Sequence, residues 1–285
     1  MDDNQKKVPF APDSSPVDLE LKRIHEALGT IYNREIEELK KTPTTIVSIK
    51  ATSFLAGQCV MFADSALFLM EDTRQPLSVP VALLRTCLEA QARCNHIVAA
   101  HGQARELLAD ELTRLMDLGH EYYEKKVIAL SKEMVGDPTK LPPRDRAYFP
   151  AVNLLHAKTD TSKLKDIKKS YDELSRKWSY AKVVEREKFK DPNSLKRSEA
   201  QPLQPALDLA YIQCCAFVHC DPASIRHQNL MSRVGVAHTL VLSEIIAVTC
   251  FFVALGKDRI AELVAIKKAI INFDVNEKVL PKSWL

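Results

Sequence analysis

Apolar residues recur at helical spacing through most of this 285-residue chain. The first such stretch predicts a helix that begins at the Ser15-Pro16 pair, an N-cap followed by proline, and ends near Lys41. Its apolar face is formed by Leu19, Ile24, Leu28, Ile31 and Ile36. Further helices are predicted at about 45–72, 78–101, 103–134, 203–219, 222–231, 234–256 and 258–272.

Sequence patterns typical of strands are missing. The chain has only 7 glycines, and no sustained two-residue alternation is bounded by Asn-Gly or Asp-Gly turns. No strand–helix–strand rhythm and no glycine-rich phosphate loop occur either, which excludes a standard nucleotide-binding fold. The sequence therefore predicts an all-α protein built as a helical bundle.

The stretch 136–200 differs from its flanks. Four prolines in 136–157 predict a loop or crossover, and 158–198 carries thirteen Lys and Arg against seven Asp and Glu. The net charge there is +6, so the rest of the chain carries −3 of the total of +3. We expect tails at 1–14 and 275–285, bundle halves at 15–135 and 201–274, and a basic helical insertion at 136–200 that either lies over the core or protrudes.

Glu244 is the only Asp, Glu, Lys or Arg between Arg233 and Lys257, within an otherwise apolar run. A carboxylate in such surroundings needs a cation or hydrogen-bond donor. Arg85, Arg93 and His219 are the natural partners, whereas His25, His101 and His156 are interpreted as surface residues. Glu244 is therefore predicted to be part of a buried polar centre, either as a structural ion pair or as a catalytic carboxylate.

The predicted helix 78–101 carries a polar stripe. Because successive residues turn by about 100°, Arg85, Glu89 and His96 lie within about 40° of one another, with Arg93 beside them. One interpretation is a solvated face with an Arg–Glu pair. The other is an inward stripe that lines a cleft and binds a substrate.

The segment from Cys214 to His227 brings Cys, His, Asp and Arg together at a helix junction, where free backbone N–H groups also converge. His219, Arg226 and His227 are candidate site residues there. A zinc site through Cys215, His219, Cys220 and His227 matches no usual ligand spacing, and no Glu-x-x-His motif occurs, so we expect no metal or other cofactor.

The basic segment interleaves cations with aromatic residues, a combination found where phosphates are neutralised and bases stacked. Its candidate nucleic-acid-binding residues are Lys168, Lys169, Arg176, Lys177, Trp178 and Lys182. The alternative interpretation is a solvated helix that packs its aromatic side chains on the core.

The predicted cellular location rests on three observations. The N-terminus has no apolar signal region, and the seven Cys, an odd number without framework spacing, favour the reducing cytoplasm. The run 234–256 is long enough to span a bilayer, but its polar residues favour a buried central helix. No second span is expected, and no membrane association is predicted.

Two patches resemble a family of bacterial all-helical proteins of unknown function. One is the run Leu83 to Glu89, and the other combines Tyr211, Cys214, His219 and Pro222, although two residues separate His219 from Pro222. The resemblance implies a helical bundle in which Arg85, Glu89 and His219 lie near one another.

That family in turn resembles HEPN-type helical domains, whose ribonuclease members use an Arg-x4-6-His motif. Arg233 to His238 and Arg114 to His120 fit this spacing. The resemblance implies that Arg233 stabilises phosphate charge and that His238 acts as general acid–base.

Two functional hypotheses follow. One is a cytoplasmic HEPN-like protein that binds or cleaves RNA without a metal, as a toxin or in phage defence, with His219 and Glu244 as further catalytic candidates. The alternative is a non-catalytic protein-interaction module with a structural polar core. Either one is compatible with a cognate protein partner or a homodimer.

Overall fold

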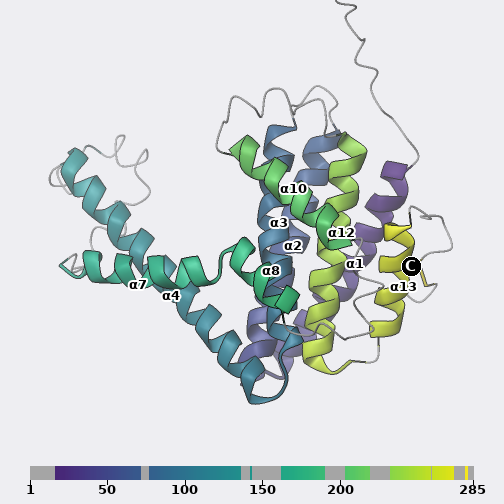
Figure 1. Ribbon diagram of the computed structural model, residues 1–285, viewed down its shortest axis with the longest axis horizontal. Helices are drawn as coiled ribbons and strands as arrows, with labels where there is room; N and C mark the ends of the chain where they lie inside the picture. The colour runs from purple at the N-terminus through teal and green to yellow at the C-terminus, as the bar shows by residue number, and fades with distance from the viewer. Residues whose placement is uncertain are drawn as a thin grey trace, which may run out of the picture.

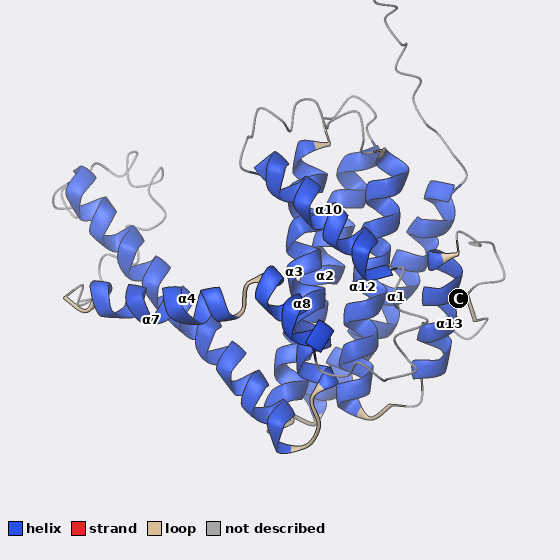
Figure 2. Ribbon diagram, in the orientation of Figure 1, coloured by secondary structure: helices blue, strands red, loops and turns tan. Residues whose placement is uncertain are grey.

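The computed structural model describes residues 17–71, 77–135, 142, 162–189, 203–218, 232–257, 259–272 and 280–281. All regular elements in these ranges are helices, which confirms the predicted all-α class (Figures 1 and 2). They are α1 (Val17–Lys41), α2 (Val47–Glu71), α3 (Ser78–Ala99), α4 (Gln103–Val135), α7 (Leu164–Lys177), α8 (Tyr180–Phe189), α10 (Leu203–Val218), α12 (Arg233–Leu255) and α13 (Ile260–Ile271).

The core is formed where α2, α3 and α12 pack against one another. α12 is the central helix, with most of its residues buried around the whole circumference, as its apolar run predicted. The side chain of Ser232 caps its first turn by accepting a hydrogen bond from Gly235 N at 3.0 Å. Gly256 ends it in the left-handed conformation, at φ 67°, that favours glycine.

The other helices surround this core. α1 and α13 pack on α12, and α4 packs on α2. α8 and α10 both cover α3, and Figure 1 shows them on the same side of it. α3 therefore lies between α2 and α12 on one side and an outer layer of α8 and α10 on the other.

The described part of the basic segment forms two helices, α7 and α8. α7 packs along α4, and Figure 1 shows this pair extending to one side of the bundle, whereas α8 packs on α3. Trp178, between the two helices, is fully buried. The segment thus protrudes with α7 and lies on the core with α8, so each of the two expected arrangements holds for one part of it.

Two helices are long and apolar enough to cross a membrane by length and composition alone: Val47–Glu71, with 28% of its most apolar window buried, and Arg233–Leu255, with 83% buried. The burial of α12 agrees with the expected central helix. α2 also meets this test of length and composition, so the expectation that the chain has no second membrane span stays a prediction. The expected helix 222–231 and the tail 1–14 lie outside the described residues.

Candidate functional site

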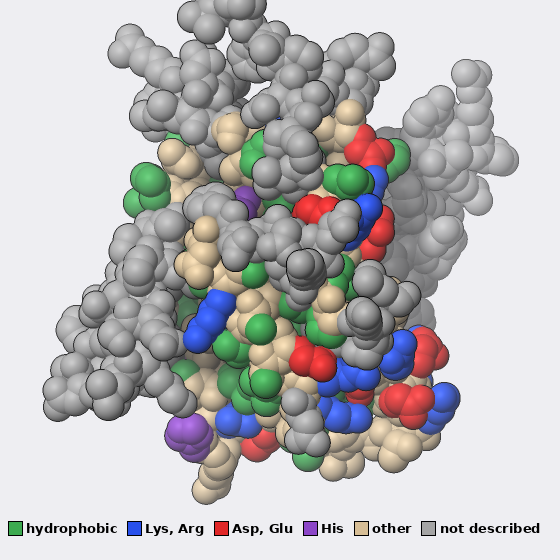
Figure 3. Space-filling view, turned by 90° about the vertical axis from the view of Figure 1, so that its right-hand side faces the viewer, with side chains coloured by type: hydrophobic (Ala, Val, Ile, Leu, Met, Phe, Trp, Pro, Cys, Tyr) green, Lys and Arg blue, Asp and Glu red, His purple; other side chains and the backbone are tan. Residues whose placement is uncertain are grey.

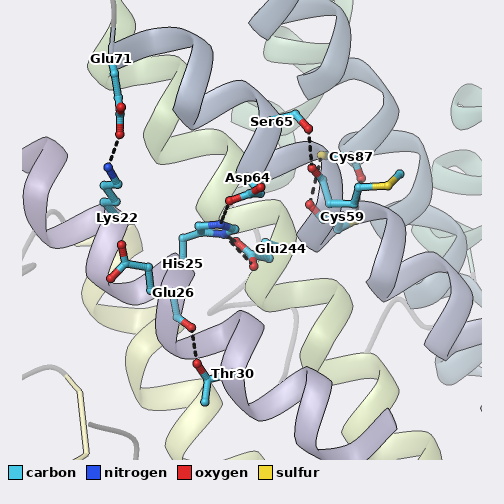
Figure 4. A network of polar contacts seen from close by, with 11 residues as sticks. Lys22, His25, Glu26, Thr30, Cys59, Asp64, Ser65, Glu71, Cys87 and Glu244 are labelled. Atoms are coloured by element: carbon cyan, nitrogen blue, oxygen red, sulfur yellow. Dashed lines mark hydrogen bonds and ion pairs between the residues drawn. The ribbon is translucent and has the colours of Figure 1, made fainter. Parts of the chain in front are cut away.

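Glu244 is fully buried and is bound by His25 (Figure 4). His25 Nδ1 lies 2.9 Å from Oε2 and 3.1 Å from Oε1 of Glu244, and His25 Nε2 lies 3.4 Å from Asp64 Oδ1. α1, α2 and α12 thus each contribute one residue. We call His25, Asp64 and Glu244 the His25 centre.

The predicted buried polar centre exists, but two of its expected partners are wrong. Arg85 and Arg93 pair with Glu89 instead, and His219 lies outside the described residues. The interpretation of His25 as a surface residue is also wrong, because its exposed fraction is 6%. Helical spacing could have indicated that His25 is buried, because it lies four residues after Leu21 and three before Leu28, and both leucines are buried.

Burial changes the protonation of both partners. It raises the pKa of the Glu244 carboxyl from its ordinary 4.5 to about 7, although the hydrogen bond and charge of His25 lower it. For His25, burial is the largest single influence and lowers the pKa. The hydrogen bonds and charges of Glu244 and Asp64 outweigh burial and raise the His25 pKa above its ordinary 6.5. The pair therefore holds protons more tightly than the same groups do in an unfolded chain.

A groove of about 540 Å³ between α1 and α2 borders the His25 centre. His25 and Asp64 line it, together with Tyr32, Asn33, Gly57 and Met61. A carboxylate that holds Nδ1 of a histidine directs Nε2 outward, an arrangement that can exchange a proton. The hydroxyls in this lining are already engaged, since Tyr32 donates to Ser53 O at 2.9 Å and Thr30 to Glu26 O at 2.9 Å. The described groove thus offers proton exchange without an activated nucleophile.

A second polar cluster lies where α3 meets α10. Arg85 Nε lies 3.2 Å from Glu89 Oε1, and an Arg93 terminal nitrogen lies 3.7 Å from Glu89 Oε2. Tyr211 donates a hydrogen bond to the same Glu89 Oε1 at 3.2 Å, and the Arg85 guanidinium lies 5.8 Å from the centre of the Tyr211 ring. We call Arg85, Glu89, Arg93 and Tyr211 the Glu89 centre.

The Glu89 centre is about one quarter exposed and continues toward α8. The rings of Tyr211 and Tyr180 stack with centroids 3.9 Å apart, and the Tyr180 hydroxyl donates to Asp208 Oδ1 at 3.1 Å. The Arg–Glu pair of the solvated-face interpretation is present here, but a tyrosine of another helix is added to it. The single shared interior centre that the sequence suggested is therefore two centres.

His96 and Arg93 hold the basic segment in place. The ring of Trp178 packs edge-on against His96 with centroids 5.4 Å apart, and Arg93 Nε donates to the Trp178 carbonyl at 3.2 Å. Trp178 Nε1 donates to Glu111 Oε1 at 2.6 Å. The prediction that His96 binds a substrate is wrong, because the side chain is buried, at 2% exposure.

Trp178 itself is a correction to the nucleic-acid prediction, since a ring that is fully buried is not available to stack on a base. Two of the exposed cations nearby have acidic partners: Lys177 pairs with Glu111, and Lys168 with Asp172 at 2.6 Å. The other candidates, Lys169, Arg176 and Lys182, are exposed. Their nucleic-acid role stays a prediction.

Acids and bases are also interspersed on the side of the molecule opposite the α4–α7 pair (Figure 3). Along α1, Glu20 pairs with Arg23, Glu37 with Lys40 and Glu38 with Lys41. Along α1, these mixed charges form no continuous positive field for a polyanion.

Arg233 and His238, the pair that fits the HEPN spacing, have different partners. One Arg233 guanidinium nitrogen donates to Met70 O at 3.1 Å, and His238 Nε2 lies 2.6 Å from Ile270 O. Burial lowers the pKa of His238, against the hydrogen bond to Ile270, so the imidazole is held neutral. These contacts tie α12 to α2 and to α13. Arg226 and His227 lie outside the described residues.

Among the described residues, no group of three or more His, Cys, Asp or Glu is arranged to hold a metal ion. No known protein family, curated protein or solved structure matches the chain.

The His25 centre predicts how stability depends on pH. Because the pKa values of Glu244 and His25 are both raised on folding, the stability they contribute is fully present below the ordinary Glu pKa of 4.5. It is lost as pH rises through about 7, where Glu244 ionises, and through the raised pKa of His25. The advantage of the parent protein over Glu244→Gln should therefore shrink between about pH 5 and pH 8.

Melting temperatures of the two proteins across this pH range measure that difference. His238 contributes with the opposite sign, since its pKa is lowered, but it is present in both proteins and cancels. An advantage that grows with pH would mean that the Glu244 pKa is depressed by His25 rather than raised by burial.

Proposed function

We propose that this chain is a non-catalytic helical interaction module whose polar centres are structural. The observation that carries the proposal is that the central carboxylate of each centre bonds a side chain of another helix. His25 of α1 bonds Glu244 of α12, and Tyr211 of α10 bonds Glu89 of α3. Contacts of this kind fix how helices are arranged, and polar groups satisfied in this way are more typical of a core than of a site awaiting substrate.

The competing candidate is HEPN-like RNA cleavage by Arg233 and His238. A general acid–base must reach the proton it transfers, and its pKa should lie near the working pH. The described contacts oppose this role, since His238 is buried against Ile270 O with a lowered pKa. Arg233, held at Met70 O, supports the helix junction in our proposal.

An RNA-cleavage assay separates the two candidates. Purified full-length protein, incubated with single-stranded RNA in the presence of a metal chelator, should leave the RNA intact. Arg233→Ala and His238→Ala should give the same result as the parent.

The control is the exposed pair on α4, Arg114→Ala and His120→Ala, because these residues also fit the HEPN spacing. Metal-independent cleavage by the parent that disappears in both Arg233→Ala and His238→Ala, but persists in the α4 variants, would refute the non-catalytic proposal. Cleavage that is lost only in the α4 variants would refute it too, and would place the site on α4.

A further inference from the structure

We propose that α2 is the docking face for a second copy of this chain, with the two α2 helices antiparallel. This inference rests on the proposed interaction function and names its partner. α2 is apolar enough to be a core helix, yet only 28% of its most apolar window is buried. Three large side chains project from it into solvent: Phe54, Met61 and Phe68, with exposed fractions of 48%, 54% and 70%.

These three residues form one stripe, which we call the α2 stripe. They are spaced seven residues apart, so each lies within about 20° of the next around the helix axis. The opposite side of α2 faces the core through Leu55, Cys59, Ala63 and Ala66. The α2 stripe is therefore the outward face of a helix whose inner face is already packed, and seven-residue apolar spacing is typical of a helix that pairs with another helix.

The α2 stripe is complementary to itself. A two-fold axis through Met61 brings Met61 against its own counterpart and Phe54 against Phe68 of the second copy. It also brings exposed Lys50, near the start of α2, close to exposed Glu71 at its end, whose carboxylate also pairs with Lys22 of α1. Parallel pairing would instead place Lys50 beside Lys50, and these two like charges repel. Charge complementarity thus favours a second antiparallel copy, the usual two-fold form of a homodimer.

The area of the α2 stripe sets the expected affinity of the dimer. Two half-exposed aromatic rings and a methionine offer on the order of 300 Å² of apolar surface per copy, against roughly 800 Å² in a standard interface. Met61 and Asp64 also line the groove beside α1, so a helix on the stripe would cover that groove as well. We therefore expect a reversible dimer that depends on protein concentration.

Sedimentation velocity of the full chain over a wide concentration range should show a shift from 32.1 kDa toward twice that mass. Met61→Lys places two like charges at the two-fold axis and should abolish the shift. Leu209→Lys is the matched control, since Leu209 is 58% exposed on α10, a helix that packs on α3, and this change should leave the shift unchanged. A parent that stays monomeric at every concentration overturns the inference, as does a dimer that Met61→Lys leaves intact.

Oxidative cross-linking tests the antiparallel direction. Met61→Cys should cross-link to itself, because the two positions meet at the axis. Phe54→Cys should not, because antiparallel pairing separates the two copies of residue 54 by about 21 Å along the helices. A mixture of Phe54→Cys and Phe68→Cys chains should cross-link to each other. Efficient Phe54→Cys self-cross-linking would overturn the antiparallel arrangement.

A lipid surface is the other occupant that the α2 stripe could meet. If the protein is monomeric and cosediments with phosphatidylcholine vesicles, and Phe68→Asp releases it, the inference of a second copy is refuted. The failure of the proposed function is a separate result, because it requires RNA cleavage that depends on Arg233 and His238 or on the α4 pair. A monomeric protein without nuclease activity would refute the dimer inference and leave the proposed function standing.

Discussion

Replacing Glu244 with Gln should lower the free energy of unfolding by about 1.5–3 kcal/mol, the range for a hydrogen bond to a charged group. The substitution keeps the shape of the side chain but removes the carboxylate that binds His25 Nδ1 at 2.9 Å inside the core. In a chain of this size the corresponding loss in melting temperature is on the order of 5 °C. Thermal unfolding at about pH 5 measures it, because most of the pH-dependent contribution of the pair, which is lost as pH rises from 4.5 through about 7, is still present there.

Glu37→Gln is the matched control for this substitution. Glu37 pairs with Lys40 at 2.7 Å on the surface of α1, where both side chains are more than 60% exposed. An exposed pair of this kind stabilises by little, so the melting temperature should change by no more than about 1 °C. If Glu244→Gln melts with the parent but abolishes an activity, the structural role of Glu244 is refuted and a catalytic one is favoured.

Replacing Trp178 with Ala should destabilise the protein by about 3–5 kcal/mol, the usual cost of removing a large buried aromatic side chain. Trp178 is fully buried, packs against His96 and bonds Glu111, and it joins α7 to α8. The cavity left behind should also loosen the hold on both helices. Denaturant unfolding gives the loss in stability. Relative to the parent protein, amide hydrogen exchange in the variant should become faster in α7 and α8 but much less so in α12.

Two further variants locate the origin of this effect. Trp178→Phe keeps most of the packing and loses the hydrogen bond to Glu111, so its loss should be clearly smaller. Lys169→Ala, at an exposed position of α7, should unfold with the parent. Wild-type stability in Trp178→Ala would contradict the buried position of the ring and restore it as a candidate for base stacking.

Helical periodicity, together with capping and helix-breaking residues, predicted most of the fold. α1, α2, α3, α4, α10, α12 and α13 begin and end within a few residues of the expected positions, because their apolar faces are long and uninterrupted. The break at Trp178 was not predicted. Residues 162–190 have helical propensity throughout, and the interruption comes from a tertiary demand, the burial of one indole against α3 and α4.

The candidate site was harder to predict from the sequence. An isolated acid in an apolar run indicated correctly that Glu244 is buried and bound by a basic side chain. Its partner could not be selected, because His25 is 219 residues away and the choice depends on how α1 crosses α12. Arg85 and Arg93 are plausible in composition, but both are three-quarters buried around Glu89 on their own helix.

The contact between Tyr211 and Glu89 was not predicted from the sequence. The resemblance implied that Arg85, Glu89 and His219 lie near one another and implied no contact for Tyr211, whose hydroxyl lies 3.2 Å from Glu89 Oε1. His219 belongs to the same motif and lies outside the described residues. The Glu89 centre is therefore the part of the molecule where a role for His219 stays a prediction.

A double-mutant cycle between His25 and Glu244 tests most directly whether the polar centre is structural. Unfolding free energies of the parent, His25→Gln, Glu244→Gln and the double variant give the coupling between the two side chains. A structural pair predicts that either single change costs most of what the double change costs, with a coupling of at least about 1 kcal/mol. Additive losses, with no coupling, would show that the two groups do not stabilise each other and would contradict the structural core.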